Sequence, residues 1–128
     1  MTTSELANLF VEMCNEGKNF DVMQQLYDDN IVSVEAARRT TGSFETAGKQ
    51  EVIQKSREWA AAHEIHGASV DGPFLLGERF GVVFEFDVTS KATGQRAKNR
   101  EIAVYTVNNG LLVREEFFYG EGANALAR

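Results

Sequence analysis

The helical spacing of apolar residues along the 128-residue chain ends near His63, and this change constrains the fold more than any other feature. Before His63, apolar residues recur every three or four positions, which is typical of helices that bury one face. After it, apolar and polar residues alternate between turn signals, as expected for antiparallel strands. The turn signals lie at residues 71–73, 77, 93–94 and 109–110. The chain is therefore predicted to be an α+β domain with its helices in the N-terminal half.

Three helices are predicted from apolar stripes in the first half of the chain. Thr2 and Glu5 have the spacing of a capping box, which favours a helix start. Asn19 is predicted to cap a second, shorter helix that carries Tyr27 on its apolar face. The expected spans are 2–17, 19–30 and about 47–62.

Five strands are predicted, one before the third helix and four after it. Residues 31–35 are rich in β-branched side chains, and the polar residues 38–43 that follow are predicted to form a loop. A sheet of long strands beside only three helices must curl around them, which leaves a space at the open end. The four later strands are expected at 65–70, 80–89, 98–107 and 111–119.

Composition excludes several classes of protein. A chain of this length with 43% apolar residues is expected to be one domain over residues 1–128. Thirteen basic against nineteen acidic residues give a net charge of −6, which disfavours nucleic-acid binding, and the basic residues at 96–100 fit a solvated hairpin tip. No apolar run approaches the ~18 residues of a membrane span, and the N-terminus lacks the basic start of a secretory signal. We therefore expect neither nucleic-acid nor membrane partners, and a cytoplasmic location.

Metal and cofactor chemistry are not expected. The single cysteine, Cys14, lies in a helical pattern and is predicted to be a small buried hydrophobic residue rather than a nucleophile. Ligand clusters of fixed spacing are absent, as are a glycine-rich phosphate loop and a Ser-His-Asp order. The sequence therefore predicts no metal and no cofactor.

Three segments, in this order and spacing, resemble a known family. They are LYDDN at 26–30 leading into Val34 and Glu35, GKQEVI at 48–53, and VNNGLLV at 107–113. The chain resembles, over its whole length, the SnoaL-like members of the nuclear transport factor 2 (NTF2-like) superfamily, which includes ketosteroid isomerases, limonene epoxide hydrolases and polyketide cyclases. The resemblance implies an NTF2-like, or cystatin-like, cone of three N-terminal helices packed on a curved, mainly antiparallel sheet.

Glu35 is the first candidate for acid-base chemistry. It ends the first strand among apolar residues, where a desolvated carboxyl can shuttle a proton. The resemblance to ketosteroid isomerases implies the same role when the alignment is anchored on Tyr27. Anchoring on Asp28 and Asp29 instead places Val34 at that position, and a solvated strand end is the alternative role for Glu35.

The two histidines, His63 and His66, are the only side chains whose ordinary pKa lies near neutral pH. On a strand they face opposite sides, so they are not expected to bind one metal ion together. His66, inside the predicted strand, is the better candidate for a cavity residue.

The register of the last hairpin decides which polar residues share a face. A two-residue turn at 109–110 pairs Asn108 with Leu111, whereas a three-residue turn with a glycine bulge pairs Val107 with Leu111. We prefer the second, because it gathers two carboxyls and two phenols among apolar side chains. The face predicted to line a cavity then contains Glu101, Ala103, Tyr105, Val113, Glu115, Phe117 and Tyr119, and the opposite face contains Ile102, Val104, Leu112, Arg114 and Phe118.

Other residues are assigned by the same reasoning. Trp59, on the apolar stripe of the third helix, fits the core and is also placed at the pocket wall. Glu85 and Asp87 share a strand face that meets either water or the cavity. The second face of the last hairpin suits a partner subunit, with Arg114 and Glu116 as charges at its rim. We therefore expect a homodimer that forms through the sheet.

These features lead to one main functional hypothesis and two alternatives. The main one is a cofactor-free isomerase, cyclase or hydrolase that acts on a small apolar molecule. Glu35 is its base, Tyr105 or Tyr119 donates to a developing oxyanion, and Glu101, Glu115 or His66 assists. The alternatives are a non-catalytic ligand-binding protein with the same pocket and a dimeric interaction module of the same fold.

Overall fold

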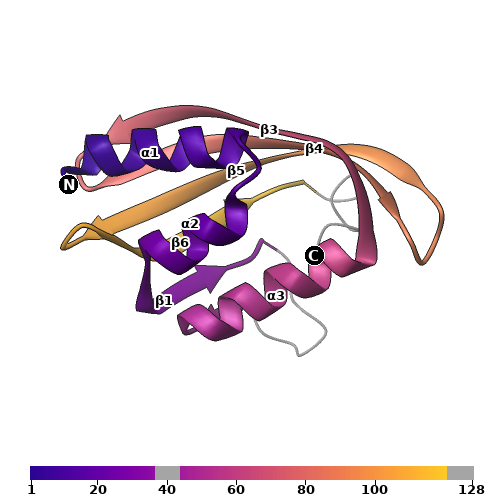
Figure 1. Cartoon of the computed structure of the whole chain (residues 1–128), viewed down its shortest axis with the longest axis horizontal. Coiled ribbons are helices and arrows are strands. Elements are labelled where there is room, and N and C mark those ends of the chain that lie inside the picture. Colours follow the sequence, from indigo (N-terminus) through magenta and orange to yellow (C-terminus); the bar gives the residue numbers. More distant parts are fainter. Residues whose placement is uncertain (37–43, 121–128) are drawn as a thin grey trace.

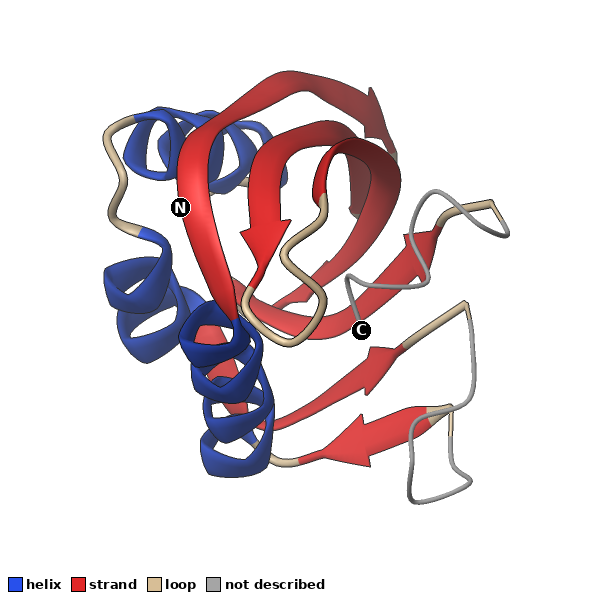
Figure 2. Cartoon of the chain, turned by 90° about the vertical axis from the view of Figure 1, so that its right-hand side faces the viewer, coloured by secondary structure: helices blue, strands red, loops and turns tan. Residues whose placement is uncertain are grey.

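Six strands form one curved sheet, and three helices lie against its concave side (Figures 1 and 2). The computed structural model describes residues 1–36 and 44–120. Neighbouring strands follow the order β2-β1-β6-β5-β4-β3, and every pair is antiparallel except β1 with β6. The predicted α+β arrangement is confirmed. The elements are α1 (Thr3–Asn15), α2 (Asn19–Leu26), β1 (Tyr27–Val34), β2 (Glu45–Ala47), α3 (Lys49–Ala62), β3 (His63–Leu76), β4 (Arg79–Ser90), β5 (Arg96–Asn108) and β6 (Leu111–Phe118).

The three predicted helices are present, with differences at their ends. The capping box of α1 is formed in both directions, since Glu5 N donates to Thr2 Oγ1 (3.1 Å) and Thr2 N donates to Glu5 Oε1 (3.0 Å). Asn19 does not cap α2, because the helix already includes it and Lys18 occupies the cap position. None of the described helices is long and apolar enough to cross a membrane.

Two predictions about the first strands were wrong. Tyr27 was placed on the second helix but begins β1, because it pairs with Leu112 of β6 and buries its ring. The strand β2 was not predicted, since three residues are too few to show an alternating pattern. The predicted loop at 38–43 lies outside the described residues.

The turn signal at 71–73 does not reverse the chain. β3 continues through it with a shift in register between Asp71 and Phe74, so the signal marks a bulge in a long, bent strand. Just before this bulge, the side chain of Asn15 at the end of α1 forms two hydrogen bonds with the backbone of Val70, each of 3.0 Å. These bonds fix α1 to the curved strand.

The last hairpin combines features of both predicted registers. Asn109 and Gly110 have φ angles of 51° and 74° and form a two-residue turn, so the preferred three-residue turn was wrong. A register shift between Thr106 and Val107 then leaves one extra residue in β6. Beyond that shift Tyr105 pairs with Glu115 and Ala103 pairs with Phe117, so these four side chains share a face as predicted.

The extra residue also corrects the prediction for Leu112. It pairs with Val107 and is fully buried, although it was assigned to the opposite face. That opposite face is exposed farther along the hairpin, where Ile102 pairs with Phe118.

An aromatic cluster fills one end of the concave face. The ring of Phe10 on α1 lies 4.5 Å from the ring of Tyr105 and 5.5 Å from that of Phe80, measured between centroids. All three side chains are almost completely buried. Farther along the same face, beyond Phe84, the helices leave a pocket.

Candidate functional site

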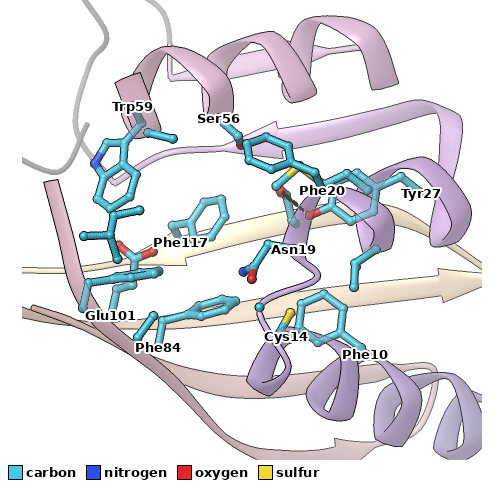
Figure 3. Close-up of a pocket in the computed structure, with 18 of the residues that line it drawn as sticks. Phe10, Cys14, Asn19, Phe20, Tyr27, Ser56, Trp59, Phe84, Glu101 and Phe117 are labelled. Carbon is cyan, nitrogen blue, oxygen red and sulfur yellow. Dashed lines mark hydrogen bonds between the residues drawn. The ribbon is translucent and has the colours of Figure 1, made fainter. Parts of the chain in front are cut away.

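A pocket of about 300 Å³ lies between the helices and the concave face of the sheet. This volume is at the small end of the range for sites that bind small molecules. Its wall is mostly aromatic and aliphatic, with rings from all three helices and from β4, β5 and β6 (Figure 3). The lining residues are Phe10, Cys14, Gly17, Asn19, Phe20, Val22, Met23, Tyr27, Ser56, Trp59, Ala60, Ile65, Ala68, Phe84, Phe86, Glu101, Tyr105, Glu115 and Phe117.

Glu101 is the ionisable residue at the Trp59 end of this pocket (Figure 3). It lies on β5 opposite Phe84 of β4, and only 2% of the residue is exposed. Trp59, Phe84 and Phe117 line the pocket with it. A carboxyl group in such surroundings is shielded from water and directed at any apolar ligand in the pocket.

Tyr27, Tyr105 and Glu115 form a second polar group, deeper in the pocket wall. The Tyr27 hydroxyl donates to the Glu115 carboxylate, with distances of 2.9 and 3.1 Å to its two oxygens. Burial, and next the negative charge of Glu115, raises the pKa of both phenols well above the ordinary value of 10. Both hydroxyls therefore keep their protons at neutral pH, and the proton of Tyr27 is the one donated to Glu115.

Cys14 contributes apolar surface to the pocket rather than a nucleophile. Burial, and next the charge of Glu115, raises the pKa of its thiol to about 12. Nucleophilic attack needs the thiolate, which is a very small fraction at neutral pH with such a pKa.

Glu35 is buried but does not line this pocket. Its side chain is fully buried, and Lys55 of α3 lies 2.6 Å from Oε1 as an ion pair. Lys55 also donates to Ser33 Oγ at 2.7 Å and lies over the ring of Phe117, 5.5 Å from its centroid. Glu35 is therefore joined to a cation behind the Phe117 side of the pocket wall.

Tyr119 belongs to the same group, since its hydroxyl donates to Glu35 Oε2 at 3.2 Å. It was predicted to line the pocket, but it is not among the lining residues. Trp59, Glu101 and Phe117, predicted with it, do line the pocket, as do Tyr105 and Glu115. Phe117 lies within β6 and lines the pocket, whereas Tyr119 lies beyond the end of this strand at Phe118.

His66 was predicted to face the cavity, but it is exposed and is not among the lining residues. A register shift between Ile65 and Gly67 turns the His66 side chain outward, where its ring nitrogen Nε2 lies 2.7 Å from Thr89 Oγ1. His63 is the buried one: its ring stacks on the pocket residue Trp59 at 4.6 Å, and Nδ1 donates to the Trp59 carbonyl at 2.8 Å.

The acids of β4 face away from the pocket. Glu85 is exposed, and Asp87 accepts hydrogen bonds from Arg96 Nε and Nη2, both at 2.9 Å. This ion pair, chiefly through its hydrogen bonds, lowers the pKa of Asp87. Between the alternatives left open for these two residues, the structure favours the solvent.

Several pocket residues had no sequence-based prediction as part of the site. Asn19 and Phe20 from α2 line the wall, which no local pattern indicates (Figure 3). Asn99 of β5 is fully buried but is not among the lining residues. Within residues 1–36 and 44–120, no group of three or more His, Cys, Asp or Glu side chains could hold a metal ion.

Comparisons with known proteins agree with this geometry. A family model described as a SnoaL-like domain matches residues 1–119. A candidate SnoaL-like polyketide cyclase from Mesorhizobium loti is 40% identical, with a TM-score of 0.88 over 93% of this chain and 100% of that one. A comparison with curated protein sequences finds no significant match.

More distant structures share the fold alone. An NTF2-like protein from Burkholderia thailandensis has a TM-score of 0.82 at 17% identity, covering 99% of this chain and 97% of that one. A protein with a cystatin-like fold from Xanthomonas campestris has a TM-score of 0.76 at 14% identity, covering 99% and 96%. The predicted NTF2-like, cystatin-like cone is thereby confirmed.

The raised pKa of Cys14 predicts how stability depends on pH. Between pH 9 and about 12 the folded protein keeps a thiol proton that the unfolded chain releases, so the free energy of unfolding falls as pH rises through this window. In Cys14→Ala this contribution is absent, and the fall should be shallower than in wild type by about 1.4 kcal/mol per pH unit. Urea unfolding at several pH values in this window measures it. Equal slopes in the two proteins would contradict the prediction. The raised pKa values of Tyr27 and Tyr105 affect both proteins alike, so they do not account for a difference in slope.

The buried ion pair predicts a large effect of Lys55→Met. Removing the cation leaves the Glu35 carboxylate buried without its charge partner, and the free energy of unfolding should fall by about 3–5 kcal/mol. The double variant Lys55→Met with Glu35→Gln should recover part of this loss, because it removes the buried charge. The exposed pair of Lys18 with Glu16 offers a control, and Lys18→Met should stay within about 1 kcal/mol of wild type. Chemical denaturation compares the four proteins, and similar losses for Lys55→Met and Lys18→Met would argue against a buried pair.

Proposed function

This chain belongs to the SnoaL-like family, and from that premise we propose that it is an enzyme that moves a proton on a small, mostly apolar substrate without a cofactor. Isomerisation and cyclisation of carbonyl compounds are the reactions that fit best. The observation that carries the proposal is the buried Glu101 carboxyl in the wall of a mostly apolar pocket. General acid-base catalysis needs such a group within reach of the substrate.

Glu101 replaces Glu35 as the proposed acid-base residue. Glu101 lines the pocket, whereas Glu35 lies behind its wall and is paired with Lys55 at 2.6 Å. In the proposed step, the Glu101 carboxylate takes a proton from a carbon next to the substrate carbonyl. The electron pair of that C–H bond forms a C=C bond, and the π pair of the carbonyl moves onto its oxygen to give the enolate. Glu101 then returns the proton to the same carbon or to another carbon of the conjugated system.

The enolate oxygen needs a hydrogen-bond donor, and Tyr105 is the proposed one. Its phenol lines the pocket and keeps its proton, since burial raises its pKa well above 10. The neighbouring Tyr27 hydroxyl already donates to Glu115, so Glu115 is proposed to assist by orienting the two phenols. A pre-positioned donor in a site shielded from water stabilises developing charge more than water does.

Deuterium exchange tests this proposal. The wild-type protein should accelerate the incorporation of deuterium from D₂O at the carbon next to the carbonyl in at least one of a panel of enolisable cyclic and aryl methyl ketones, including 2-acetylnaphthalene, followed by NMR. Glu101→Gln should lower the accelerated rate about a hundredfold or more.

The matched control is Glu85→Gln, an exposed acid on the neighbouring strand β4, which should exchange at the wild-type rate. Glu35→Gln should retain most of the activity if it folds like wild type. Full activity in Glu101→Gln would contradict the assignment of the base. Binding of the ketones without exchange in the wild-type protein would instead favour the non-catalytic ligand-binding alternative.

The cytoplasmic location remains a prediction.

We also propose that two copies of the chain associate through the outer face of the sheet. Ile102 and Phe118 pair across β5 and β6 on that face, with about half of each residue exposed. Arg114 and Glu116 form an ion pair of 3.1 Å on the same two-strand surface. An apolar centre with charges at its edge is typical of a protein interface.

Analytical ultracentrifugation tests the dimer. The wild-type protein is expected to sediment as a dimer, and Ile102→Glu with Phe118→Glu as a monomer, because two charges would be desolvated in the interface. Leu76→Glu, at an exposed apolar position on the β3-β4 hairpin, is the control and should leave the dimer intact. A wild-type monomer, or a double variant that stays dimeric, would contradict the proposal.

A further inference from the structure

Asn19 carries a polar side chain that its own helix does not use. It is the first residue of α2, and Lys18 occupies the cap position before it, with no side-chain hydrogen bond at the cap. Asparagine is strongly favoured at the cap itself but is a poor helix former once it lies inside a helix. Helix formation therefore does not account for an asparagine at this position.

The side chain of Asn19 instead faces the pocket. The residue is partly buried and lies in the pocket wall. Figure 3 shows its amide in the middle of the pocket, between the end marked by Glu101 and the end marked by Phe10. Among the described residues, no hydrogen bond joins this amide to another side chain or to the backbone. Its oxygen and its NH₂ group are thus directed at the space that a ligand would occupy.

The sheet side of the pocket has polar groups with other roles. The Tyr27 hydroxyl donates to Glu115 at 2.9 Å. Glu101 is the proposed acid-base residue, and Tyr105 is the proposed donor to the enolate oxygen. These four residues belong to β1, β5 and β6. The carbonyl end of a substrate is therefore assigned to the sheet.

The helix side contributes two lining side chains with an amide or a hydroxyl group, Asn19 of α2 and Ser56 of α3. A serine inside a helix can bond its hydroxyl to the carbonyl four residues earlier in the same helix. Asn19 has no such carbonyl, because no turn of α2 precedes it. Its amide is therefore the group on the helix side that is best placed to bind a polar atom of a ligand.

We propose that Asn19 is a specificity-determining residue that hydrogen-bonds a second oxygen of the substrate, across the pocket from the carbonyl oxygen assigned to Tyr105. The amide has a donor and an acceptor, and a hydroxyl group also has both, so a hydroxyl can pair with either end of the amide. The substrate class is then a ring ketone with a hydroxyl group on the edge that faces the helices. This inference rests on the proposed function and deepens it by naming that second group.

Binding of ketones with and without a hydroxyl group tests the inference. The probes are 2-acetylnaphthalene and its 6-hydroxy and 7-hydroxy derivatives, and equilibrium dialysis measures the affinity of each for the full chain. From wild type to Asn19→Leu, the ratio of hydroxyketone to parent-ketone affinity should fall about tenfold for at least one derivative, the effect of one hydrogen bond. The affinity for the parent ketone should not fall, because leucine is apolar and similar in size.

Two further variants serve as controls. Asn19→Asp keeps the shape and the acceptor, so its ratio should stay closer to that of wild type than to that of Asn19→Leu. An acid is also favourable in the first turn of a helix, which covers the case in which leucine disturbs α2. Gln25→Leu makes the same change from amide to leucine at an exposed position of α2 outside the pocket, and it should keep the wild-type ratio.

The outcomes separate this inference from the proposed activity. An unchanged ratio for both hydroxyketones in Asn19→Leu would overturn the role of Asn19, whatever the rates of deuterium exchange are. An equal fall in Gln25→Leu would also overturn it. A fall confined to the Asn19 variants supports the inference even if no ketone undergoes exchange. If none of the three probes binds the wild-type protein, the inference fails, while exchange on the other ketones of the panel still decides the proposed function.

Discussion

The contact of Phe10 with Phe80 and Tyr105 divides the interior of the cone into a filled half and an open half. Its ring distances of 4.5 and 5.5 Å hold α1 against the concave face at the end where β5 meets β6 in the last hairpin. Beyond the cluster the strands continue but α1 does not, since it ends at Asn15. The space that remains is the pocket, and Phe10 and Tyr105 form one of its ends.

Glu35, Glu101 and Glu115 are all buried acids, but they have different surroundings. These surroundings indicate which acids have a structural role and which one is proposed as the acid-base residue. Glu115 is held by the Tyr27 hydroxyl, and Glu35 by the ammonium of Lys55, each within 3 Å. Such contacts stabilise a charge where it is and fix the side chain. Glu101 lines the pocket at its Trp59 end, whereas Glu35 does not line it.

Much of the fold was predictable because it depends on local patterns. The capping box at Thr2, the change of period at His63 and the turn at Asn109 each act over a few residues, and all three appear in the structure. Part of the site followed from parity, because Glu101 and Tyr105 must share a face of one strand. Irregular strands limited this reasoning. The bulge beside His66 reversed its predicted direction, and the extra residue in β6 buried Leu112.

The sequence by itself determined the order of elements and the alternation of each strand, since both arise from the spacing of apolar side chains along the chain. It also favoured a register in which carboxyls and phenols share one face of the last hairpin, although the register shift that produces this arrangement lies within the strands and not at the turn. Only the tertiary structure decided which acid meets the pocket. Glu35 and Glu101 are both buried acids on strands, yet Lys55 of α3 lies beside one, whereas the other lines the pocket. That choice depends on how helices pack across a curved sheet, and contacts between residues distant in the chain leave no local pattern.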